Sequence, residues 1–169
     1  SEGLKNLYKL TSRSYINGFY KMPRIDVDLI RQYAKGQIVC STACLGSEFF
    51  KIIGDNQGSY DVDTWELQEG AVHSNIISKM ESFAWEMVEA LGGEENFYLE
   101  LQMNKLKEQS YLNKYLMDLS KKTGLKCIVT ADSHYSDPSH WREREIYKLL
   151  GRQQQRSKGN GSEYDTLSA

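Results

Sequence analysis

The sequence predicts an α/β protein whose strands run parallel and which forms part of a larger α/β barrel. Helical and β-prone segments alternate along the 169 residues. Strands that are separated by helices pair in parallel through right-handed crossovers. Only three β-prone segments are present, which is few, because a parallel sheet normally extends or closes until helices cover both of its faces. We therefore expect several helices around a small parallel sheet.

Two helices are predicted before the first strand. The apolar residues of the first recur close to helical spacing, and Gly18 supplies a stop signal. After Pro23, Asp26 can cap a second helix that ends at Gly36. The buried stripe predicted for the first helix consists of Leu4, Leu7, Tyr8, Tyr15 and Ile16.

The central part of the chain supplies two of the three strands. The run "QIVCS" (37–41) is β-prone and leads through a turn into a helix that ends near residue 54. Residues 55–68 are polar and rich in turn formers, so they predict a loop. Helical spacing returns over 71–91, and the glycine pair at 92–93 closes this helix. "NFYLELQ" (96–102) is the second strand.

The clearest helix follows, with Gly124 as its C-terminal cap. "KCIVTA" (126–131) predicts the third strand, and a last helix begins after Pro138. Residues 1–152 are expected to fold, and 153–169 to form a polar, mobile tail or linker. The apolar stripe of the clearest helix is Leu112, Tyr115, Leu116 and Leu119.

Composition favours a soluble protein of the cytoplasm. Apolar residues make up 40% and charged residues 26% of the chain. No run approaches the roughly 18 apolar residues of a membrane span, and the first residues lack the layout of a signal peptide. Three cysteines form no disulfide framework, which favours a reducing compartment.

Charge is unevenly distributed. Residues 1–35 and 142–158 are basic, whereas residues 48–100 carry twelve acidic and two basic side chains. These segments form either solvated helix faces or basic flanks along the path of a polyanion.

Polar side chains that could carry chemistry follow the predicted strands. Function in α/β proteins gathers where parallel strands end. Cys44 follows the first strand, and Asp132 and His134 follow the third. Residues two apart in an extended segment point to one side, and carboxylate and imidazole are ligands for zinc or manganese. A thiolate from Cys44 would favour zinc, but a plain turn in which Asp132 caps backbone amides remains an alternative.

The other candidates have more ordinary interpretations. Cys40 and Cys127 lie within strands and are expected to be buried packing residues. His73 and His140 are expected at the surface. Glu100 shares a strand face with Tyr98 and Gln102 and is either an outer partner of a metal site or half of a strand salt bridge.

Five stretches together resemble the PHP domain of bacterial DNA polymerase III alpha subunits, the C-family replicative polymerases. They span residues 3 to 151 in the family's order: "GLKNLYKLTSRSYINGFYKMPRIDVDLI", "GQIVCSTACLGSE", "NFYLELQ", "KEQSYLNKYLMDLSKKTGLKCIVTADSHY" and "REIYKLL". The resemblance implies a distorted seven-stranded (β/α) barrel whose strand ends bind up to three metal ions. It places Cys44, Asp132 and His134 at ligand positions. In members with intact sites the metals support 3′-5′ exonuclease proofreading, and in others the domain is structural.

The resemblance also implies a parent enzyme and its partners. The parent would be a DNA-directed DNA polymerase, a nucleotidyltransferase of DNA replication, with magnesium in its polymerase site. Its partners would be DNA, the rest of the subunit, a proofreading subunit and a sliding clamp, without a membrane. The family's His-x-His strand and polymerase aspartates are absent from these 169 residues, so the segment alone is expected to be inactive. The basic residues proposed to touch nucleic acid or a partner are Arg142, Arg144, Lys148 and Arg152.

Three functional hypotheses follow. The chain is a polymerase segment with a metal-competent PHP site, a structural and partner-binding module of the same polymerase, or a free-standing metal-dependent phosphoesterase. The five polymerase-like stretches favour the first two.

Overall fold

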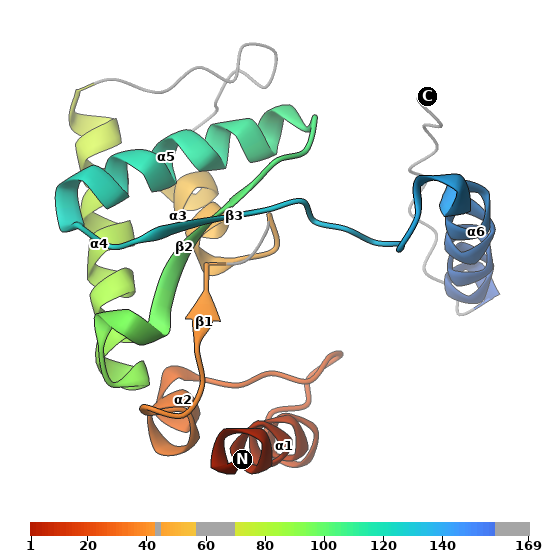
Figure 1. Ribbon diagram of the computed structural model, residues 1–169, viewed down its shortest axis with the longest axis horizontal. Coiled ribbons are helices and arrows are strands. Elements are labelled where there is room, and N and C mark those ends of the chain that lie inside the picture. Colours follow the sequence, from red (N-terminus) through yellow and green to blue (C-terminus); the bar gives the residue numbers. More distant parts are fainter. Residues whose placement is uncertain (43–44, 57–69, 158–169) are drawn as a thin grey trace. The chain divides into compact units, whose positions relative to one another are not determined.

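The computed structural model describes residues 1–42, 45–56 and 70–157, with side chains through residue 150. The chain forms two compact units, Ser1–Ala131 and Asp132–Ala169 (Figure 1). No helix in the described residues has the length and apolar character needed to cross a membrane. The elements are α1 (Glu2–Ile16), α2 (Val27–Tyr33), β1 (Cys40–Ser41), α3 (Glu48–Asn56), α4 (Ala71–Leu91), a 3₁₀ turn (Glu94–Asn96), β2 (Phe97–Gln102), α5 (Lys107–Thr123), β3 (Cys127–Thr130), a second 3₁₀ turn (Pro138–His140) and α6 (Trp141–Ser157).

A three-stranded parallel sheet organises the first unit. The strand order is β1-β2-β3, so β2 is the central strand. Two residues of β1 pair with β2, beginning at Cys40 opposite Phe97, and four pairs join β2 to β3, ending at Gln102 opposite Thr130. The prediction of parallel strands separated by helices is confirmed. The predicted loop at 55–68 falls almost entirely outside the described residues.

The core lies where α4 and α5 pack against β2 (Figure 1). β2 alternates as its sequence predicts, since Phe97 and Leu99 are buried in the core while Glu100 lies on the other face with intermediate exposure. α3 adds Phe49, whose ring centroid lies 5.3 Å from that of Phe83. The predicted stripe of α5 is fully buried at Leu112, Tyr115, Leu116 and Leu119.

The predicted helix ends are confirmed at three positions. The Asp26 carboxylate accepts a hydrogen bond from the Leu29 backbone N–H at 2.8 Å and so caps α2. Gly92 and Gly124 end α4 and α5 in the left-handed conformation, with φ of 86° and 79°. Glycine adopts this conformation without the steric cost that a Cβ brings.

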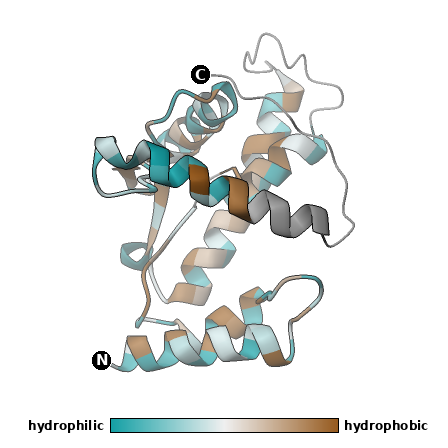
Figure 2. Cartoon of the chain, turned by 90° about the vertical axis from the view of Figure 1, so that its right-hand side faces the viewer, coloured by the Kyte–Doolittle hydropathy of each residue, from teal (hydrophilic) through white to brown (hydrophobic). Residues whose placement is uncertain are grey.

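The buried stripe predicted for α1 is wrong. Ile16 is 73% exposed, and the other four predicted residues are 47–63% exposed. Leu10 and Ser14 are the buried residues of this helix, because α1 packs against α2 along a narrow line. Figure 2 shows hydrophobic residues interspersed with hydrophilic ones along α1, and most of these hydrophobic side chains are exposed.

The expectation that Cys127 is a buried packing residue is also wrong. Cys127 is exposed, and so are Ile128 and Val129, at 37% and 66%. β3 lies at the edge of the sheet, where one side of the strand has no pairing partner among the described residues. Cys40 is partly buried in β1, and burial raises the pKa of its thiol, as expected for a packing residue.

Replacing Gly18 with alanine is expected to destabilise the connection between α1 and α2. A Cβ at this position would lie 2.0 Å from the backbone oxygen of Arg24. A backbone atom cannot rotate aside as the end of a flexible side chain can. We expect a loss of about 1–3 kcal/mol, typical of overpacking, in urea unfolding of the 169-residue chain. Gly54→Ala is the matched control, because its Cβ meets no atom within 4 Å and alanine favours helix α3. Equal effects of the two substitutions would contradict this prediction.

Candidate functional site

The C-terminal ends of the three strands are joined by one carboxylate. Glu100 lies near the end of the central strand, and its partners are the last residues of β1, β2 and β3. Ser41 Oγ donates to Glu100 Oε2. Thr130 Oγ1 and Gln102 Nε2 donate to Oε1 at 2.7 Å and 3.3 Å. Both oxygens of the carboxylate are therefore engaged by neighbouring strand ends.

Hydrogen bonds extend this network into the core. The Glu100 backbone N–H donates to Thr42 Oγ1 at 2.8 Å. On the other side, Asn113 Nδ2 of α5 donates to the Gln102 carbonyl oxygen at 2.9 Å, and Gln109 Nε2 donates to Asn113 Oδ1 at 3.0 Å. Three of the four buried polar residues in the described part of the chain, Thr42, Gln102 and Gln109, belong to this network. Buried polar groups of this kind are retained when hydrogen bonds satisfy them.

Its hydrogen bonds lower the pKa of Glu100. The bond from Ser41 is the largest cause, burial opposes it, and the bonds from Thr130 and Gln102 act in the same direction as Ser41. Because the pKa in the folded protein lies below the ordinary value of 4.5, the ionised form stabilises the fold above about pH 4.5. This contribution is lost as the pH falls through the lowered pKa.

Acidification is thus expected to destabilise the wild type more than Glu100→Gln. The amide does not ionise, so the difference in free energy of unfolding between the two proteins should shrink as the pH falls from 7 to below 4.5. The effect is small, because burial opposes the lowering of the pKa by the hydrogen bonds. Urea unfolding at each pH measures it. If the difference in free energy of unfolding grew on acidification, it would contradict a lowered pKa for Glu100.

Asp132 and His134 are held together at the start of the second unit. Asp132 has a positive φ of 52°, so the backbone is not extended there, contrary to the prediction. Instead, His134 Nδ1 lies 2.7 Å from the Asp132 backbone oxygen and 4.0 Å from its carboxylate oxygen Oδ1. A carbonyl oxygen accepts only, so Nδ1 carries the proton and donates. With Nδ1 used as the donor, Nε2 is the ring nitrogen left for a metal, which is the arrangement that metal-binding histidines use.

The described residues give Asp132 no capping role. Its carboxylate forms no hydrogen bond to a backbone amide within them, whereas Asp137 caps a 3₁₀ turn by accepting from the Ser139 N–H at 2.8 Å. These hydrogen bonds from Ser139 lower the pKa of Asp137.

Two of the predicted contact residues lie beside His134. Arg144 and Lys148 line a pocket of about 330 Å³ within the second unit, together with Tyr135, Trp141, Glu145 and His134 itself. Lys148 Nζ pairs with Glu145 Oε1 at 2.7 Å. The guanidinium of Arg142 lies 5.3 Å from the ring centroid of Trp141.

Cys44 lies outside the described residues, and so does the side chain of Arg152. Among the described residues, no three His, Cys, Asp or Glu side chains gather as a metal site.

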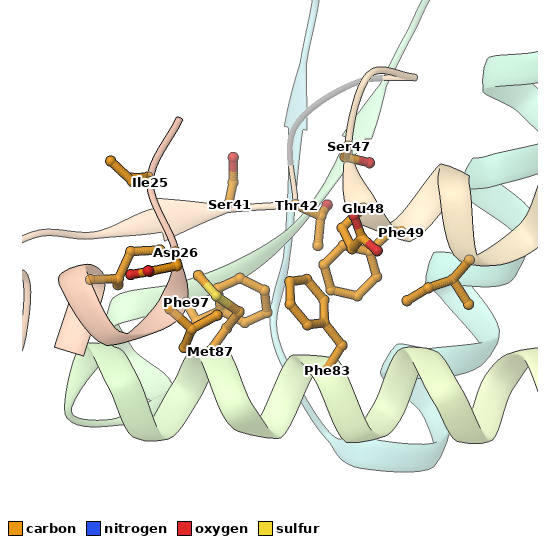
Figure 3. Close-up of a pocket in the computed structure, with 13 residues that line it drawn as sticks. Ile25, Asp26, Ser41, Thr42, Ser47, Glu48, Phe49, Phe83, Met87 and Phe97 are labelled. Atoms are coloured by element: carbon orange, nitrogen blue, oxygen red, sulfur yellow. The ribbon is translucent and has the colours of Figure 1, made fainter. Parts of the chain in front are cut away.

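A larger pocket, of about 450 Å³, lies beside β1 in the first unit. Figure 3 shows Phe49, Phe83, Met87 and Phe97 forming its apolar part above α4. Ser41 points away from these rings, toward the face that carries Glu100, as its hydrogen bond requires.

Sequence reasoning missed the environment of His73. This histidine was expected at the surface without a carboxylate partner. Its ring stacks on Tyr115 with centroids 5.1 Å apart, and Nε2 lies 3.4 Å from the Asp118 carboxylate. The pair joins α4 to α5, a contact between helices that local spacing does not reveal. His140 is exposed, as predicted.

Comparisons with known proteins identify the family of the chain. The family model described as the PHP domain matches residues 1–104, and the chain belongs to the PHP domain family. Its relatives include proteins named DNA polymerase III subunit alpha. That of Helicobacter pylori (strain J99) is 32% identical over 86% of this chain and 11% of its own length. That of Aquifex aeolicus is 34% identical over 81% of this chain and 10% of its own length. That of Borreliella burgdorferi is 31% identical over 97% of this chain and 12% of its own length. The chain thus spans about a tenth of the length of these curated relatives.

Proposed function

We propose that the chain is a PHP segment of a bacterial-type replicative DNA polymerase and takes part in DNA replication. The observation that carries this proposal is similarity to DNA polymerase III alpha subunits across most of the chain. The parallel sheet supports a partial, distorted seven-stranded barrel, because the outer edges of β1 and β3 have no pairing partner among the described residues. Further strands would pair at these edges.

We also propose that Cys44, Asp132 and His134 contribute to a zinc or manganese site with 3′-5′ exonuclease activity. Thiolate, carboxylate and imidazole suit these metals. The Nδ1 hydrogen bond of His134 supports binding through Nε2. Because no three donors gather among the described residues, further ligands are required, and the segment alone should bind metal weakly.

A bound metal would lower the pKa of a water molecule and stabilise charge on a phosphate undergoing hydrolysis. The Asp132 carboxylate would bind the metal, and the hydrogen bond from His134 Nδ1 to the Asp132 carbonyl oxygen would keep the ring oriented. The cations of Arg144 and Lys148 beside His134 would attract DNA phosphates. Tyr135 and Trp141 offer rings on which an unpaired base can stack.

The proposed setting is that of a replicative polymerase in the cytoplasm. DNA and the rest of the alpha subunit would be its partners, with a proofreading subunit and a sliding clamp bound through the parent protein. Magnesium would serve the polymerase site, which lies outside these 169 residues in this proposal.

A structural and partner-binding role is the second candidate. The exposed apolar residues of α1 and β3 favour it, because such surface is usually covered by other protein. On this view the PHP segment stabilises the polymerase without hydrolysing DNA.

Metal analysis and an exonuclease assay on the full-length protein that carries this chain distinguish the two roles. The purified protein is measured for bound zinc and manganese, then incubated with a 3′-labelled primer without nucleotides. Stoichiometric metal and hydrolysis that stops on chelation would support the exonuclease. Absence of both, with primer extension intact, would overturn it and favour the structural role.

A further inference from the structure

We infer that Glu100 is a positioning residue that holds the C-terminal ends of all three strands together, and with them the two segments that carry the proposed ligands. Cys44 follows Ser41 by three residues, and Asp132 follows Thr130 by two. The link to metal binding rests on the proposed function. The role of Glu100 in holding the strand ends together does not depend on that function.

Glu100 compensates for a weak backbone ladder. Among the described residues, β1 and β3 do not pair with each other, and β1 joins β2 through two residue pairs. The Glu100 carboxylate reaches Ser41 on one side and Thr130 on the other, each diagonal to it in the pairing register. Its backbone N–H adds a bond to Thr42, beyond the last residue of β1.

The contacts of Glu100 distinguish a positioning residue from a metal ligand. Its two oxygens accept three hydrogen bonds, so few lone pairs remain for a metal. No basic side chain in the described residues forms an ion pair with it, which excludes a strand salt bridge within that part of the chain. The contacts of Glu100 are to Ser41, Gln102 and Thr130 at the strand ends, so Glu100 acts on the proposed ligands only through the strands that lead to them.

Both neighbouring strands must supply a donor to an ionised carboxylate, which only accepts hydrogen bonds. Glutamine can keep the same contacts, because a hydroxyl also accepts and either Ser41 or Thr130 can rotate to receive its N–H. Alanine removes every side-chain contact. Glu100→Gln is therefore the conservative variant and Glu100→Ala the disruptive one.

The test measures hydrogen exchange and metal affinity in the full-length protein. The amides of Thr42 and Met103 donate to Tyr98 and Thr130, so they report on the β1-β2 and β2-β3 ends. In metal-free Glu100→Ala these two amides should exchange faster than in the wild type. Its zinc and manganese affinity should fall roughly 10–100-fold, the usual cost of losing an outer-shell partner. Glu100→Gln should restore most of both.

Glu86→Ala is the matched control, because Glu86 is exposed on α4 away from the sheet. It should change neither the exchange rates nor the metal affinity.

If Glu100→Ala does not fold, Thr130→Val removes one hydrogen-bond donor to Glu100 with little change in shape. It should speed the exchange of the Met103 amide alone. Exchange that matches the Glu86→Ala control would overturn the inference. If the wild type binds no metal, the proposed function and the link to metal both fail, while exchange still decides whether Glu100 holds the strand ends.

Discussion

Asp132→Asn is expected to remove most of the metal affinity of the full-length protein while leaving its fold intact. Loss of an outer-shell partner costs roughly 10–100-fold in affinity, and loss of a ligand should cost more. The backbone at Asp132 has a φ of 52°. Asparagine tolerates this left-handed conformation as well as aspartate does, so the substitution removes charge without adding backbone strain. Calorimetric titration with zinc and manganese measures the change, and 3′-5′ hydrolysis should fall with it.

Asp137→Asn supplies the matched control. It makes the same chemical change five residues later at an exposed position, and asparagine can still accept the bond from Ser139 that caps the turn. Primer extension should be unchanged in both variants. Wild-type affinity in Asp132→Asn, or an equal loss in Asp137→Asn, would remove Asp132 from the ligand set.

The positions of the helices and strands could be predicted because their signals are local. The apolar spacing of 71–91 gives α4 with the predicted ends, and Gly92 closes it. Asp26 caps α2 through its own side chain. Each of these features depends on residues within a few positions of one another, so the sequence carries them directly.

Burial could not be predicted as well, because it depends on what packs against each face. α1 has an amphipathic pattern, yet Ile16 is 73% exposed, since α2 covers only a narrow line of the helix. Cys127 lies in a β-prone run, yet β3 is an edge strand. Apolar spacing reports the capacity to bury a face, and the neighbours decide whether it is buried.

The sequence nominates candidate site residues by their type and position, but it does not reveal the hydrogen bonds between distant residues. Asp132 and His134 follow a strand end, which suffices to nominate them. The hydrogen bonds of Glu100 join residues 59 and 30 positions away, at Ser41 and Thr130. Alternation along β2 showed which face Glu100 occupies, but only the strand order shows that one carboxylate meets three strand ends.

Leu116→Ala is expected to destabilise the chain by about 2–5 kcal/mol, the usual cost of removing a buried leucine. Leu116 is fully buried on α5 against the face of β2 that carries Phe97 and Leu99. Alanine keeps the helix propensity, so the loss comes from the apolar contacts and the cavity left behind. Urea unfolding of the 169-residue chain measures it.

Met117→Ala tests whether burial is the cause. Met117 is the next residue of the same helix, and it is 42% exposed. Its loss should stay within about 0.5 kcal/mol, as for most surface substitutions. Equal losses at both positions would mean that α5 packs differently.

Because Leu116 lies on the core face and Glu100 on the other, Leu116→Ala should lower stability with metal affinity unchanged in the folded protein. Glu100→Ala should lower metal affinity beyond what its loss of stability explains, and this contrast separates a core residue from a positioning one.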